Sequence, residues 1–122
     1  MNISEAESMV MKVFWNKHPL SCSDVVDALS DQQQWQEATV KTFLNRLLKK
    51  GALRSEKDGR RYLYSPVLTH EEWLSSESDG MLSKLFNGKL APFVAHFGAH
   101  KKLSKRELIE LKELIERLSD EQ

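Results

Sequence analysis

The side chains best suited to bind another molecule lie on one face of a predicted helix over residues 37–50. Thr42, Asn45 and Arg46 share this face, opposite an apolar stripe that repeats at helical spacing. Hydroxyl, amide and guanidinium groups on one helix face can hydrogen-bond base edges in the major groove of DNA. We therefore expect contacts at or near the bases from Thr39, Thr42, Asn45 and Arg46.

A predicted β-hairpin follows this helix and carries positive charge at its tip. Asp58-Gly59 between two extended runs is a strong hairpin signal. Lys57, Arg60 and Arg61 lie beside that turn, where they could reach phosphates or the adjacent minor groove. The residues expected mainly at phosphate are Lys41, Lys49, Lys50, Arg60 and Arg61.

Positive charge is concentrated in this part of a chain that is neutral overall. The segment Glu37–Arg61 holds eight basic and three acidic residues, so its net charge is +5 and the rest of the 122-residue chain carries −5. Neutralisation of phosphate charge drives affinity for DNA, so this distribution favours a DNA-binding surface. On charge alone, a solvated basic face remains an alternative.

Residues that could support catalysis or hold a metal are few. Cys22 is the only cysteine and has no nucleophile motif around it, so we expect a small buried side chain. His96 and His100 have a spacing that could share a metal, but Gly98 lies between them and no carboxylate or cysteine is close in sequence. We expect no enzyme activity, no cofactor, no metal and no small-molecule substrate.

Capping signals predict the helices that position the polar face. Ser4 and Glu7 form a capping box before a first helix. Ser21 or Ser23 can cap a second, short helix, and Gly51 ends the third. Three helices followed by a hairpin predict a mainly α fold of the α+β type: a winged helix-turn-helix with a small antiparallel β-wing over residues 1–67.

The remaining residues, 68–122, predict a C-terminal helical dimerisation domain. Helices of this length cannot bury all their apolar side chains within so small a domain, and exposed apolar patches usually mark an interface. The alternative is that these helices fold back on the N-terminal core. The residues assigned to dimerisation are Trp73, Met81, Leu82, Leu85, Leu90, Phe93, Val94, Phe97, Leu108, Leu111, Ile115 and Leu118.

The composition gives no sign of export or membrane insertion. No apolar run approaches the ~20 residues that span a bilayer. The first seven residues are polar and acidic, unlike a signal peptide. A single cysteine suits a reducing compartment, so we expect a cytoplasmic protein.

Several collinear segments resemble the penicillinase-repressor family (BlaI/MecI/CopY). They are residues 38–51 (ATVKTFLNRLLKKG), the opening 4–7 (SEAE), 61–64 (RYLY) and 85–88 (LFNG). The resemblance extends over about residues 3–118. It implies a winged helix and a homodimer that binds palindromic operators and represses resistance or stress genes.

The resemblance also implies finer features. A short strand is expected near Leu20.

In relatives that control β-lactam resistance, a membrane sensor metalloprotease leads to cleavage of an Asn–Phe bond. The matching bond here is His96–Phe97, which keeps only the phenylalanine. Copper-responsive relatives carry C-terminal Cys-x-Cys motifs, which residues 119–122 do not match, so we expect no such metal sensing. A protein-interaction module that uses its C-terminal helices without DNA remains the alternative function.

Overall fold

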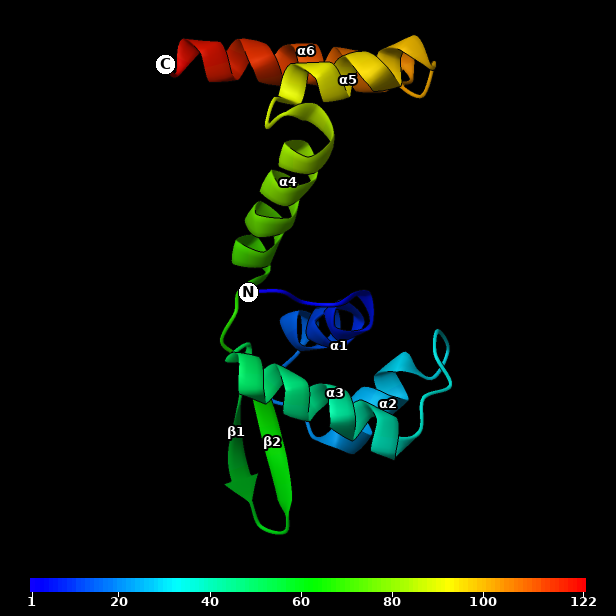
Figure 1. Cartoon of the computed structure of the whole chain (residues 1–122), viewed down its shortest axis with the longest axis vertical. Helices are drawn as coiled ribbons and strands as arrows, with labels where there is room; N and C mark the ends of the chain where they lie inside the picture. The colour runs from blue at the N-terminus through cyan, green and yellow to red at the C-terminus, as the bar shows by residue number, and fades with distance from the viewer. The chain divides into compact units, whose positions relative to one another are not determined.

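The computed structural model describes residues 1–122 and divides into two compact units, Met1–Ser75 and Ser76–Gln122. The elements are α1 (Glu5–Asn16), α2 (Cys22–Leu29), α3 (Glu37–Lys50), β1 (Leu53–Asp58), β2 (Arg61–Pro66), α4 (His70–Phe86), α5 (Leu90–Ala99) and α6 (Lys105–Asp120) (Figure 1). The boundary lies after Ser75 and not after residue 67, so α4 begins in the first unit.

Helices α1 and α2 begin where the capping signals predict. The Ser4 hydroxyl accepts from the Glu7 backbone N–H at 3.1 Å, and Glu7 Oε1 accepts from the Ser4 backbone N–H at 2.9 Å. Ser21, and not Ser23, caps α2 in the same reciprocal way with Asp24. These bonds satisfy backbone donors that the first turn of a helix leaves free.

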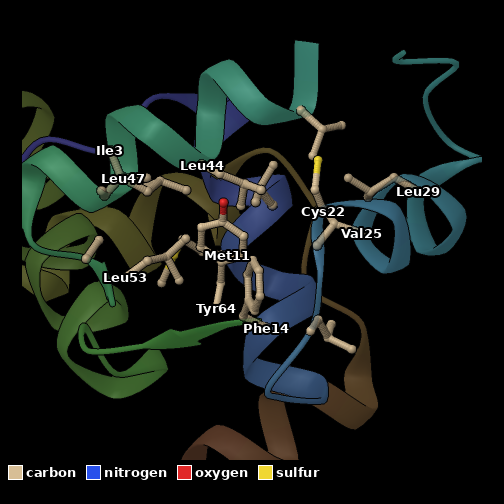
Figure 2. Close-up of a cluster of buried hydrophobic side chains, with 14 residues drawn as sticks. Ile3, Met11, Phe14, Cys22, Val25, Leu29, Leu44, Leu47, Leu53 and Tyr64 are labelled. Carbon is tan, nitrogen blue, oxygen red and sulfur yellow. The ribbon is translucent and has the colours of Figure 1, made fainter. Parts of the chain in front are cut away.

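The core of the first unit lies where α1, α2, α3 and the hairpin meet (Figure 2). Phe14 from α1 is fully buried and packs edge-on against Tyr64 of β2, with ring centroids 6.5 Å apart. The other side chains of this cluster are Ile3, Val10, Met11, Leu20, Cys22, Val25, Leu29, Val40, Leu44, Leu47, Ala52 and Leu53. Full burial of a side chain such as Phe14 or Leu44 contributes about 1.5–3 kcal/mol.

The hairpin is antiparallel and its loop differs by one residue from the expected one. Asp58 pairs with Arg61, so Gly59 and Arg60 form the loop. Gly59 has φ +65°, which suits the first loop position of a type II′ turn. Leu20 pairs with Tyr64 through two backbone hydrogen bonds of 3.1 and 2.8 Å, so an isolated β-bridge stands where a short strand was expected near Leu20. The first unit is therefore a winged helix.

An aromatic contact at the start of α4 explains why the first unit extends beyond residue 67. The Trp73 ring lies 5.3 Å from that of Trp15, and Trp15 Nε1 donates to the Leu68 carbonyl at 2.8 Å. Trp73 therefore packs on the core of the first unit. The other residues assigned to dimerisation from the sequence do not belong to this core.

The second unit holds no buried residue. α5 and α6 enclose an open apolar groove of about 620 Å³, lined among others by Phe93, Phe97 and Leu111. Leu85, Leu90 and Ile115 are about 60% exposed, at 62%, 60% and 59%. None of the helices in the chain combines the length and apolar composition that a bilayer span needs.

The buried Glu7 carboxylate, which is part of the α1 cap, makes the stability of the fold depend on pH. Burial by itself would raise the pKa of Glu7, but hydrogen bonds from Lys50 and Ser4, with the charge of Lys50, hold that pKa below its ordinary value. A carboxylate whose pKa is lowered by folding stabilises the protein at neutral pH, and this contribution disappears as the pH falls through that pKa.

We expect Glu7→Gln to lower the free energy of unfolding by about 1–3 kcal/mol near neutral pH, because the variant loses a charge-assisted hydrogen bond. The difference from wild type should shrink as the pH falls through the lowered pKa of Glu7, because the wild-type carboxyl then becomes neutral as well. Urea unfolding over a series of decreasing pH values measures this difference, with Glu5→Gln, at an exposed position of the same helix turn, as control. A difference that does not change with pH would contradict the expectation.

Candidate nucleic-acid interface

The polar face of α3 is exposed, as a groove-binding helix requires. Val40, Leu44 and Leu47 are fully buried, so helical geometry places the opposite side of α3 toward solvent. Thr39 is half-buried, and the predicted contact residues that are exposed on α3 are Lys41, Thr42, Asn45, Arg46, Lys49 and Lys50. No side-chain hydrogen bond caps α3 at Gln36, as the weak sequence signal there indicated.

Arg46 lies over the ring of Phe43, which in turn packs against Trp35. Its guanidinium carbon lies 6.0 Å from the centre of the Phe43 ring, which is 4.9 Å from the ring of Trp35. Phe43 and Trp35 are half-buried and join α3 to the loop before it. An aromatic face attracts a guanidinium and reduces the number of conformations it samples. Sequence reasoning missed this support, although an aromatic residue three positions before an arginine on a helix was a usable signal.

Cations of the wing and of α3 surround one small cavity. Lys41 Nζ lies 5.9 Å from the centre of the Tyr62 ring, which is 46% exposed. Arg61 contacts Asp58 at 3.4 Å in an exposed ion pair. The cavity has a volume of about 210 Å³ and is lined by Ser21, Cys22, Ser23, Glu37, Lys41, Arg60, Arg61, Tyr62 and Tyr64. The fold thus brings the first turn of α3 and the hairpin tip together; Tyr62 is a further surface residue that sequence reasoning missed.

Lys50 is placed differently from the other predicted phosphate ligands. Its ammonium group is 2.6 Å from Glu7 Oε1 and 2.8 Å from the Asn2 carbonyl oxygen. Lys49, the preceding residue, is exposed and makes no ion pair. Contact of Lys50 with phosphate stays a prediction, and the structure gives its charge another partner.

The side chains with catalytic or metal-binding potential do not assemble a reactive site. Cys22 is 8% exposed, which confirms the expected burial. Burial and the nearby Glu37 carboxylate raise the pKa of its thiol, and Lys41 opposes this only in part. The rings of His96 and His100 lie 4.3 Å apart, but no third histidine, cysteine or acidic residue joins them to form a metal site.

A winged helix with an exposed polar face on its third helix and a basic wing defines a DNA-binding domain. Comparison with known families identifies which class of DNA-binding protein this is. The Penicillinase repressor family matches residues 3–117, and the chain belongs to that family.

Individual relatives agree with this assignment. The chain is 36% identical over 114 residues to the penicillinase repressor of Bacillus licheniformis, covering 93% of this chain and 89% of the relative. It is 27% identical over 113 residues to the methicillin resistance regulatory protein MecI of Staphylococcus aureus, covering 93% and 92%.

Two solved structures resemble part of this chain. The DNA-binding domain of the repressor BlaI is 39% identical, with a TM-score of 0.53 over 58% of this chain and 87% of that one. Monomeric BlaI of Bacillus licheniformis in complex with the blaP half-operator is also 39% identical, with a TM-score of 0.51 over 59% and 88%. The chain is a DNA-binding transcriptional repressor of this family and not an enzyme.

The environment of Cys22 predicts an unreactive thiol. Only the thiolate is a good nucleophile, so a raised pKa together with burial should slow alkylation. We expect a neutral maleimide to label native protein far more slowly than urea-unfolded protein at the same pH, measured by mass spectrometry. We also expect Cys22→Ala to retain DNA affinity. Rapid native labelling, or loss of binding in a folded Cys22→Ala variant, would contradict a purely packing role.

Proposed function

We propose that the protein is a homodimer that binds a palindromic DNA operator and so represses the adjacent gene. The observation that carries this proposal is the convergence of the polar face of α3 and the basic wing. Lys41, Arg60 and Arg61 line one cavity beside the exposed Thr42, Asn45 and Arg46. We assign Thr39, Thr42, Asn45 and Arg46 to the bases, and Lys41, Lys49, Arg60 and Arg61 to phosphates.

Each subunit would occupy one half-site with α3 in the major groove. Two-fold symmetry would place the half-sites about one helical turn apart, roughly 34 Å, or a multiple of it. The relative described as monomeric BlaI in complex with a half-operator supports one subunit per half-site.

The second unit supplies the proposed dimer contact. None of its residues is fully buried within one chain, and most of the stability of a helix in a protein comes from packing of its apolar face. A second copy would cover this apolar surface. The residues assigned to it are Met81, Leu82, Leu85, Leu90, Phe93, Val94, Phe97, Leu108, Leu111, Ile115 and Leu118; Trp73 is left out because it packs on Trp15.

The regulated genes would serve resistance or stress responses, and the protein would act in the cytoplasm. The relatives named penicillinase repressor and methicillin resistance regulatory protein support the first point. A membrane sensor metalloprotease is the partner that the family resemblance implies. Its candidate target, the His96–Phe97 bond, lies inside α5, so cleavage would require local unfolding of that helix.

DNase footprinting on the DNA upstream of the gene for this protein tests the proposal. We expect protection of two inverted half-sites, with affinity that falls as salt rises. A fragment with one half-site scrambled is the matched control and should bind more weakly. Absence of salt-sensitive binding to any duplex from that locus would overturn the proposal, and so would a protected site without two-fold symmetry.

Arg46→Ala should weaken operator binding by about 1–3 kcal/mol if Arg46 contacts a guanine, because a bidentate base contact is lost. Binding to a random duplex of equal length should change little. Fluorescence anisotropy with both duplexes measures the two losses. Equal losses on operator and random DNA would show that Arg46 contacts only phosphate.

Ile115→Asp should shift the protein from dimer to monomer, because the buried interface would then hold an unpaired charge. Ile109→Asp is a matched control: both isoleucines are 59% exposed on α6, but helical spacing places them about 120° apart around its axis. Sedimentation equilibrium measures the shift. A dimer that survives Ile115→Asp, or an equal effect of Ile109→Asp, would contradict the assigned interface.

A further inference from the structure

Lys50 lies in the last turn of α3, and its ammonium group binds residues near the N-terminus of the chain. Its Nζ donates to Glu7 Oε1 at 2.6 Å and to the Asn2 carbonyl oxygen at 2.8 Å. Glu7 is 2% exposed, whereas the Lys50 side chain is 35% exposed. The bond therefore joins a buried carboxylate in the first turn of α1 to the C-terminal end of the helix proposed to read DNA.

The Glu7 carboxylate depends on Lys50 for charge compensation. Glu7 Oε1 also accepts the Ser4 backbone N–H at 2.9 Å, which closes the cap of α1. Glu7 Oε2 is buried and has no hydrogen-bond partner. Charge-assisted hydrogen bonds are about twice as strong as neutral ones, and removal of one partner leaves the other charge uncompensated. The pair therefore resists displacement of α3 relative to α1.

We propose that Glu7 is a positioning residue for α3, and that Lys50 affects DNA binding through the placement of this helix and not through a phosphate contact. This inference rests on the proposed function. It assigns a role to Glu7, which contacts α3 through Lys50 and does not line the cavity beside the wing, and it replaces the expectation that Lys50 is a phosphate ligand.

Lys49 and Lys50 are a natural matched pair for the test. They are adjacent, have the same side chain and the same charge, and both lie in the last turn of α3. Each phosphate contact that is lost lowers the slope of log affinity against log salt by about one unit. Substitution of a residue that acts only by placing the helix leaves this slope unchanged. Such a substitution lowers affinity for the operator sequence more than affinity for random DNA.

The experiment is a salt titration of affinity for the operator fragment and for a random duplex of equal length. We expect Lys49→Met to reduce the slope by about one on both duplexes. Lys50→Met should keep the wild-type slope and lose about tenfold in operator affinity, with little change on random DNA. Glu7→Gln should reproduce the Lys50→Met pattern. Lys50→Arg, which retains the charge and can reach the carboxylate, should restore operator affinity.

A double variant keeps the test decisive if a single substitution destabilises the fold. Glu7→Gln with Lys50→Met removes both charges, so it leaves no buried carboxylate without a partner. Its loss of operator affinity should be smaller than the sum of the two single losses, since the residues act as one pair. Circular dichroism verifies that each variant is folded at the temperature of the binding assay.

Three results would overturn the inference. A salt slope for Lys50→Met that falls as it does for Lys49→Met would make Lys50 a phosphate ligand, and the proposed function would stand. Additive losses in the double variant would show that Glu7 and Lys50 act independently. Absence of salt-dependent binding by the wild type would overturn the proposed function and this inference with it.

Discussion

Burial of one stripe of α3 against α1, α2 and the hairpin is the constraint on which the rest of the first unit depends. Val40, Leu44 and Leu47 have no exposed surface, and they form the inward face of a helix that also has eight polar or charged positions. Because side chains three and four apart share a face, burying this stripe forces Asn45 and Arg46 outward. The exposure of the surface proposed to contact DNA is thus a consequence of core packing on the other side of α3.

The wing is joined to the same core through Tyr64. This residue is 2% exposed, packs on Phe14 and pairs through its backbone with Leu20. Its neighbours in β2 point the opposite way, because strand side chains alternate between faces. Tyr62 and Tyr64 lie on one face and Arg61 on the other, yet all three line the cavity at the start of α3. Packing of one tyrosine therefore sets where the positive charge of the hairpin is presented.

The second unit poses the opposite physical problem, because it has amphipathic helices without a core. Phe93, Phe97 and Leu111 line an open groove, and Leu85, Leu90 and Ile115 remain largely in solvent. Apolar surface of this kind is costly in water and favours association. The two units thus follow different principles: the first is stabilised by its own interior, whereas the second leaves its apolar surface exposed.

The sequence alone determined what depends on local interactions: the capping box at Ser4, a serine cap before α2, the length of α3, its glycine stop, and the polar face that carries Arg46. These features follow from contacts within four residues and from the helical period, so they can be read in order along the chain. The tertiary structure decided what depends on residues far apart. Lys50 meets Glu7 across 43 positions, and Trp73 joins Trp15 and so extends the first unit to Ser75. Long-range pairs leave no periodic signal, because packing in three dimensions and not spacing selects their partners.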